Sequence, residues 1–152
     1  MATRNIVKIG ESILREKCRE VTVFDERLGV LIDDMVETMF RANGVGLAAP
    51  QVGILKRVCV VSVDGKKVYE LINPVILKSS GEQIGPEGCL SIPNRRGDVM
   101  RPKKLTVEAF DRKGKKVKFN VDGFTAVAFC HEIDHLDGIM FIDKVVGKVE
   151  EE

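Results

Sequence analysis

The sequence FTAVAFCHEIDHLDG, residues 124–138, decides the fold because it joins an apolar run to a histidine pair. His131 and His135 are the only two histidines in the chain. On an α-helix, side chains four residues apart lie on one face, about one turn from each other. Two imidazole nitrogens in that arrangement can bind one divalent metal ion, and Glu132 lies beside them as a candidate to move a proton. This stretch therefore predicts a helix that carries two ligands of a metal ion.

The first half of the same helix is apolar, which predicts that the helix is buried. Buried histidines and a buried glutamate need partners, and one metal ion would satisfy all three side chains together. The alternative is an amphipathic charged helix whose histidines lie on the surface or are hydrogen-bonded in the core. The apolar residues Phe124, Val127, Ala128 and Phe129 disfavour that alternative.

Length and composition indicate one globular domain over residues 1–152. Apolar residues make up 44% of the chain and charged residues 31%, which suits a packed core rather than disorder. The net charge of +1 gives no overall reason to expect a membrane or specific DNA as partner. No segment approaches the ~20 apolar residues of a membrane span, and the N-terminus lacks the apolar core of a signal peptide. We therefore expect a cytoplasmic protein whose four cysteines are reduced and available as ligands.

The order of elements predicts an α+β fold. Residues 25–42 carry apolar side chains on one stripe, which is typical of an amphipathic helix. The middle of the chain is rich in strand patterns, at 57–63, 68–72, 74–78, 104–110 and 115–121, with a hairpin turn expected at Asp64-Gly65. A second helix opens at Asp122-Gly123 and runs to about Leu136. We expect antiparallel sheets packed around this central C-terminal helix, with one N-terminal helix.

A catalytic site of this kind needs a third protein ligand and one open position. The metzincin pattern fails because Phe141 stands where its third histidine belongs, and the glutamates that follow His135 all lie in the last three residues. A cysteine from upstream is the natural candidate. Cys89 stands out because it lies in a loop-like segment, GPEGCLSIP, residues 85–93, with a glycine directly before the thiol. The alternative is a cysteine that is simply buried in a loop.

A second glycine-rich stretch, GVGLAAPQ, occupies residues 44–51. It is not a phosphate loop, because it follows a helix and lacks the Lys-Ser/Thr end. Its small residues leave backbone groups open to an extended partner, and Gln51 can supply a side-chain donor. The alternative is a tight connection between a helix and a strand.

Together, three segments resemble the three motifs of the peptide deformylase family, in that family's order and with similar spacing. They are GVGLAAPQ at 44–51, EGCLS at 87–91 and HEIDHLDG at 131–138, and the likeness extends from about Gly10 to Asp143. One departure is Cys130, where the family usually has glutamine before the first histidine. The resemblance implies a hydrolase that removes the formyl group from the initiator methionine of nascent bacterial or organellar polypeptides and releases formate.

The resemblance also implies roles for individual residues. Cys89, His131 and His135 would bind one divalent metal, with iron(II) as the native ion and zinc, nickel or cobalt as substitutes. Glu132 would be the acid and base, and Gln51 with the Leu90 backbone N–H would stabilise an oxyanion. The residues expected to bind the N-formylmethionyl peptide are Gly44, Val45, Gly46, Gly88, Arg96 and Val127.

Two other functions stay open from the residues alone, namely another HExxH metallohydrolase such as a peptidase, and a non-catalytic peptide-binding module that holds a metal. A basic stretch at residues 95–118 carries ten basic and three acidic side chains. It predicts either the solvated face of a β-hairpin or a surface that visits ribosomal RNA near the exit tunnel.

Overall fold

The computed structural model describes residues 2–151. Helix α1 spans Glu26–Arg41 and matches the predicted amphipathic segment. Asp25 caps its first turn, because the Asp25 carboxylate accepts a hydrogen bond of 3.1 Å from the Leu28 backbone N–H. Just beyond its end, Asn43 has a φ of 58°, a left-handed conformation that asparagine tolerates.

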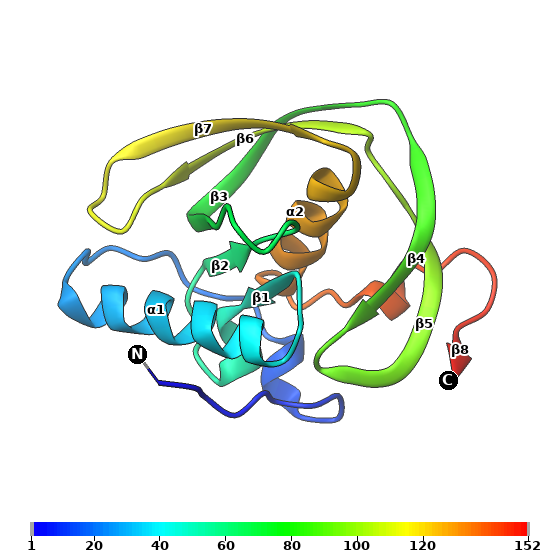
Figure 1. The fold of residues 1–152 in the computed structure, drawn as a ribbon, viewed down its shortest axis with the longest axis horizontal. Helices are drawn as coiled ribbons and strands as arrows, with labels where there is room; N and C mark the ends of the chain where they lie inside the picture. The colour runs from blue at the N-terminus through cyan, green and yellow to red at the C-terminus, as the bar shows by residue number, and fades with distance from the viewer. Residues whose placement is uncertain (1, 152) are drawn as a thin grey trace.

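A five-stranded antiparallel sheet forms the body of the molecule, with the strand order β1-β2-β3-β6-β7 (Figure 1). Its strands are β1 at Gly46–Ala48, β2 at Val58–Val61, β3 at Tyr69–Ser80, β6 at Lys104–Phe110 and β7 at Lys116–Asp122. Strand β1 is the last strand on one side, so the described strands pair with only one of its edges.

Strand β2 is buried on both faces, which explains its unbroken apolar sequence. Val58 and Val60 belong to the core cluster that α1 covers, whereas Cys59 and Val61 belong to the cluster around the second helix. The alternation follows from the period of two in a strand, and it places the sheet between the two helices. Cys59 is fully buried, as expected of a small core residue.

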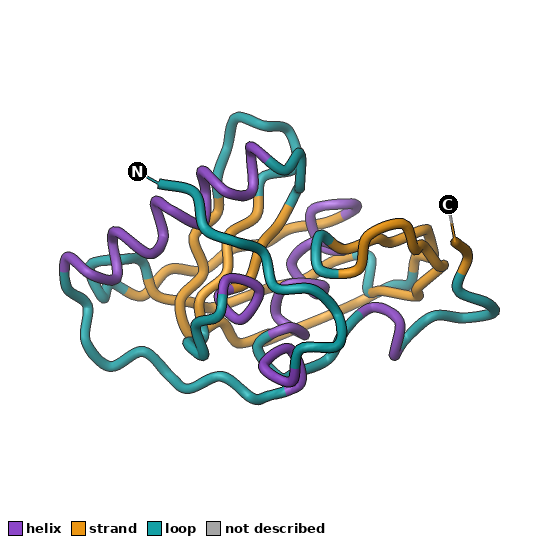
Figure 2. Tube along the Cα trace, turned by 90° about the horizontal axis from the view of Figure 1, so that it is seen from below, coloured by secondary structure: helices purple, strands orange, loops and turns teal. Residues whose placement is uncertain are grey.

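Helix α2, at Gly123–His135, lies between the five-stranded sheet and a separate hairpin (Figures 1 and 2). Its C-terminal end is held by Arg57, whose Nη1 donates to the Leu136 carbonyl oxygen at 2.9 Å. Gly138 follows with a φ of 74°, the conformation that favours glycine just past a helix. The expected α+β arrangement around a central C-terminal helix is confirmed. No helix among residues 2–151 combines the length and apolar character needed to cross a bilayer.

The hairpin beside α2 corrects one expectation. Strand β4 spans Gln83–Cys89 and β5 spans Ile92–Arg101, so the segment at 85–93 is mostly strand rather than loop. Strand β8, at Glu150–Glu151, pairs with the far edge of β5, which leaves β4 at the edge of this smaller sheet. Pro86 is tolerated there because an edge strand does not need every backbone N–H for its ladder. Three 3₁₀ helices complete the fold, η1 at Ser12–Arg15, η2 at Ala49–Val52 and η3 at Phe141–Asp143.

Strand β3 corrects a second expectation, since it runs unbroken through the two segments predicted at 68–72 and 74–78. Asn73 breaks the pattern locally, with a φ of 52° and a shift in register toward β6. Its side chain bonds to both the N–H and the carbonyl of Val21, at 2.8 and 2.9 Å. The hairpin predicted around Asp64-Gly65 is confirmed, since β2 and β3 pair antiparallel, although the connection is seven residues long.

Candidate metal centre

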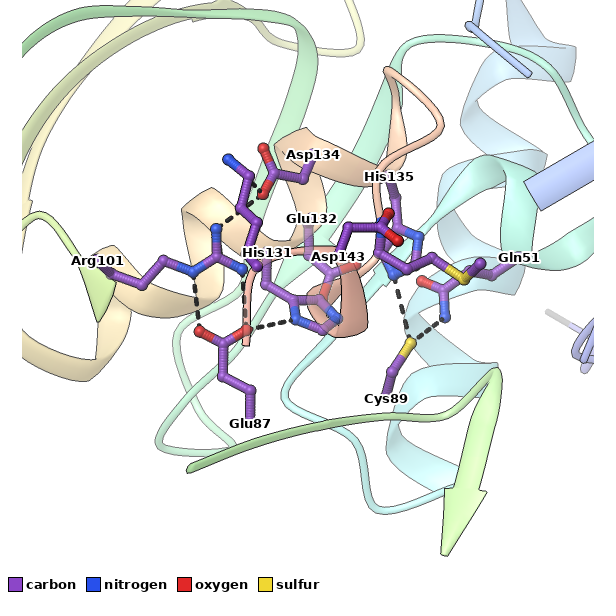
Figure 3. Close-up of polar contacts among 11 residues, drawn as sticks. Gln51, Glu87, Cys89, Arg101, His131, Glu132, Asp134, His135 and Asp143 are labelled. Carbon is purple, nitrogen blue, oxygen red and sulfur yellow. Dashed lines mark hydrogen bonds and ion pairs between the residues drawn. The ribbon is translucent and has the colours of Figure 1, made fainter. Parts of the chain in front are cut away.

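Cys89, from the end of β4, meets the two histidines of α2, although at least 42 residues separate the thiol from either histidine along the chain. One ligand atom from each of the three side chains can be chosen so that all three lie within 4.8 Å of one another. The Cys89 Sγ atom is 3.3 Å from His135 Nε2 (Figure 3). The hairpin β4–β5 therefore brings the thiol to the face of α2 that the histidine spacing defines.

The three side chains offer the donor types and spacing that fit one divalent ion. His131 Nδ1 lies 2.9 Å from Glu87 Oε1, so it is engaged as a donor and leaves Nε2 for a ligand. A thiolate with two imidazoles suits zinc and iron(II), at bond lengths of about 2.0–2.3 Å for zinc. Cys89 Sγ and His135 Nε2, which are 3.3 Å apart, are close enough for one such ion to bridge.

A buried ion-pair network supports His131 from behind (Figure 3). Arg101 donates to both carboxylate oxygens of Glu87, at 2.8 and 2.9 Å, and its Nη1 donates to Asp134 at 2.7 Å. Lys144 lies 3.4 Å from the same Asp134 oxygen. The sequence interpretation missed these roles, because Arg101 was counted with the basic stretch, whereas the structure buries it at 4% exposure.

The charges around the histidines favour a bound cation. Burial alone would lower the pKa of His131, but the Glu132 carboxylate, the Cys89 thiol and Glu87 together raise it well above its ordinary value. Burial lowers the pKa of His135 well below its ordinary value. His131 thus lies in a negative environment that favours positive charge, while His135 is kept neutral, as a metal ligand must be.

Gln51 reaches the same place from η2. Its Nε2 lies 3.4 Å from Cys89 Sγ and donates to Ser91 Oγ at 3.0 Å, while its Oε1 accepts from the Ala48 N–H at 3.0 Å. These contacts fix the orientation of the amide and aim its donor at the thiol. Leu90 forms the turn between β4 and β5, directly after Cys89. Ser91 lies in the quoted motif but received no role from the sequence.

A pocket of about 360 Å³ opens beside the histidine pair. It is lined by all six residues expected to bind the peptide, and by Gln51, Cys89, Leu90, His131 and Glu132. His135 lies behind this group and does not line the pocket. Phe124 also lines the pocket although half of its surface is exposed, and the sequence interpretation gave it no binding role. The three sequence motifs therefore converge on one open site.

A buried HExxH helix, a cysteine held against its histidines and a pocket at the intervening glutamate define a hydrolase of the HExxH metalloenzyme class. Within that class, the family model for polypeptide deformylase matches residues 3–151. This chain belongs to the polypeptide deformylase family.

Individual relatives agree with that assignment. The chain is 55% identical to a peptide deformylase of Acetivibrio thermocellus over 152 residues, covering 100% of this chain and 89% of the relative. It is also 55% identical to that of Heliobacterium modesticaldum, with both chains covered completely. The crystal structure of the Thermotoga maritima peptide deformylase superposes with a TM-score of 0.93 at 38% identity, covering 97% of this chain and 100% of that chain.

Proposed function

We propose that Cys89, His131 and His135 hold one divalent metal ion and that Glu132 serves as the acid and base of the reaction. The observation that carries this proposal is the approach of the Cys89 thiol to within 3.3 Å of His135 Nε2. Membership of the family gives the reaction. The enzyme hydrolyses the N-formyl group of the initiator methionine of nascent polypeptides and releases formate.

Glu132 has the surroundings that a proton carrier needs. Burial raises the pKa of Glu132 to about 7, so that it can both accept and return a proton near neutral pH. Its Oε1 atom is buried and has no hydrogen-bond partner among residues 2–151. A divalent ion, when bound, supplies a Lewis acid and lowers the pKa of a bound water from 15.7 toward ~7. Glu132 accepts a proton from the attacking water and delivers it to the leaving amine.

Gln51 and Leu90 are the proposed donors to the developing oxyanion. The Gln51 amide lies at the edge of the ligand group, 3.4 Å from Cys89 Sγ, and Leu90 follows the cysteine in the chain. Loss of one donor of this kind typically costs ~10²–10³ in rate.

The remaining pocket residues are the proposed contacts to the substrate. Val45 and Val127 offer apolar surface to the methionine side chain, and Arg96 lines the same pocket beside Gly88. The outer edge of β1 is unpaired among the described strands, so a peptide can add to it as a further strand beside Gly44 and Gly46. Gly88 also lines the pocket and would contact the same peptide.

Three finer assignments complete the proposal. The native ion is iron(II), with zinc, nickel and cobalt as substitutes. The enzyme works in the bacterial cytoplasm, where nascent chains emerge. Six lysines of the basic stretch stay exposed and would make weak, salt-dependent contacts with ribosomal RNA near the exit tunnel. They are Lys103, Lys104, Lys113, Lys115, Lys116 and Lys118.

The test combines metal analysis with formate release from formyl-methionyl peptides. The protein as purified without oxygen should carry one metal ion per chain, mostly iron, and should release formate. The Glu132→Gln variant should keep the metal and lose turnover, since it retains the ligands but cannot take up the proton. A metal-loaded wild-type protein that releases no formate, or a Glu132→Gln variant with full activity, would contradict the proposal.

A further inference from the structure

We propose that Gly46 is a positioning residue, because the missing side chain at Gly46 leaves the space that the Glu132 side chain occupies. This inference rests on the proposed acid–base role of Glu132. Gly46 would then have two roles. Its backbone would bind the peptide, and its lack of a Cβ atom would leave room for the Glu132 side chain.

The distances are too short for a Cβ atom at this position unless the Glu132 side chain shifts. A Cβ atom built on Gly46 would lie 2.4 Å from Glu132 Oε2 and 2.8 Å from both Cδ and Cγ of the same side chain. Carbon atoms in contact lie about 3.5–4.0 Å apart. The Glu132 side chain, from α2, therefore occupies the space that a Cβ atom of residue 46 in β1 would need.

The backbone conformation does not explain the glycine. Gly46 is not among the described glycines with positive φ, and it pairs with Val61 as an ordinary strand residue. Glycine inside a strand is unfavourable relative to alanine and often marks a close approach by another group. The close approach here is that of Glu132.

Among residues 2–151, the Glu132 carboxylate is in contact mainly through packing. Glu132 is only 3% exposed, and its Oε1 has no hydrogen-bond partner among the described residues. Its Oε2 lies 3.9 Å from His131 Nε2, which is beyond hydrogen-bond distance. Among the described residues, the surface of Gly46 therefore limits where this carboxylate can lie.

Strand β1 cannot easily move away from Glu132. Its residues are buried, it is paired to β2 from Gly46 to Ala48, and Val45 accepts a 2.8 Å hydrogen bond from the Ser62 N–H. The flexible partner is the Glu132 side chain. A methyl group on Gly46 would push the carboxylate about 1 Å to restore ordinary contact, and a misplacement of about 1 Å can cost roughly 10²-fold in rate.

The first experiment measures turnover and metal content of the metal-loaded Gly46→Ala enzyme on a formyl-methionyl peptide. We expect kcat to fall by roughly 10²-fold, with KM near the wild-type value and one metal ion still bound. Gly85→Ala is the matched control, because Gly85 is also a strand glycine without positive φ and its Cβ would meet nothing within 4 Å. An unchanged kcat in Gly46→Ala, or an equal loss in Gly85→Ala, would overturn the inference.

The second experiment keeps the inference testable if Gly46→Ala folds poorly. In the Glu132→Ala background the colliding atoms are absent, so adding Gly46→Ala should lower the unfolding temperature much less than it does in wild type. An equal loss in both backgrounds would mean that the strand itself requires glycine, and the inference would be wrong. The proposed function fails separately, through retained activity in Glu132→Gln while Gly46→Ala is still impaired.

Discussion

Replacing Glu87 by glutamine tests how far the buried network behind His131 stabilises the fold. Burial alone would raise the pKa of Glu87, but hydrogen bonds from Arg101 and His131 outweigh burial and hold this pKa at about 2, against an ordinary value of 4.5. At 1.36 kcal/mol per pKa unit, the difference corresponds to about 3 kcal/mol of stabilisation from the ionised carboxylate. Glutamine keeps the shape of the side chain and removes its charge.

The sign of the pH dependence follows from the lowered pKa. The stabilisation is fully present above the unfolded-state pKa near 4.5 and is lost as the pH falls from there toward about 2. At pH 7 the wild type should therefore be more stable than Glu87→Gln by about 3 kcal/mol, and this difference should shrink as the pH falls through that window.

Urea unfolding at a series of pH values, on protein treated with a chelator, measures this difference without a contribution from metal release. Glu82→Gln, which removes an exposed carboxylate between β3 and β4, is the matched control. The reasoning would be refuted by a difference that is absent at pH 7, or by one that stays constant down to pH 2.

Two further substitutions test the packing after α2 and the proposed metal ligands. Gly138→Ala should lower the unfolding temperature more than Gly147→Ala: both positions have positive φ, but only at Gly138 would a Cβ meet backbone, 2.4 Å from the Arg15 carbonyl oxygen. Equal shifts in thermal unfolding of the two variants would count against this packing. Cys89→Ser should reduce bound metal to a small fraction of one ion per chain with little change in far-UV circular dichroism, because a hydroxyl is a far poorer ligand than a thiolate. Full metal retention by this variant, measured by elemental analysis, would contradict the ligand assignment.

The sequence was sufficient for the elements whose patterns are strong. The apolar stripe predicted α1 almost to the residue, and the run after Gly123 predicted a buried α2. The continuous apolar sequence of β2 matches its burial on both faces. Each of these elements forms because its apolar side chains are buried, and the spacing of apolar residues in the sequence predicts that burial.

The wrong predictions concern elements at sheet edges or bends, where local interactions outweigh the sequence pattern of glycine, proline and apolar residues. Glycine and proline around Cys89 suggested a loop, yet an edge strand such as β4 tolerates both. The sequence predicted two strands on either side of Asn73, but the Asn73 side chain hydrogen-bonds to the Val21 backbone, and β3 continues through a shift in register.

The sequence likewise predicted some features of the candidate site and missed others. The histidine spacing pointed to a metal, the need for a third ligand pointed to Cys89, and the resemblance implied that the three residues bind one ion together. None of these revealed that Arg101 is buried between Glu87 and Asp134, since a basic residue in a basic stretch gives no local sign of burial. The contact between Gly46 and Glu132 joins residues 86 positions apart and was invisible until the fold brought them together.

The most direct test of the metal centre is a crystal structure of the metal-loaded protein, with anomalous diffraction recorded at the absorption edge of the metal. One ion should lie within bonding distance of Cys89 Sγ and of one nitrogen from each histidine, with Glu132 close by but not bound to it. An ion held without the Cys89 sulfur, or located away from the histidine pair, would contradict the proposed centre.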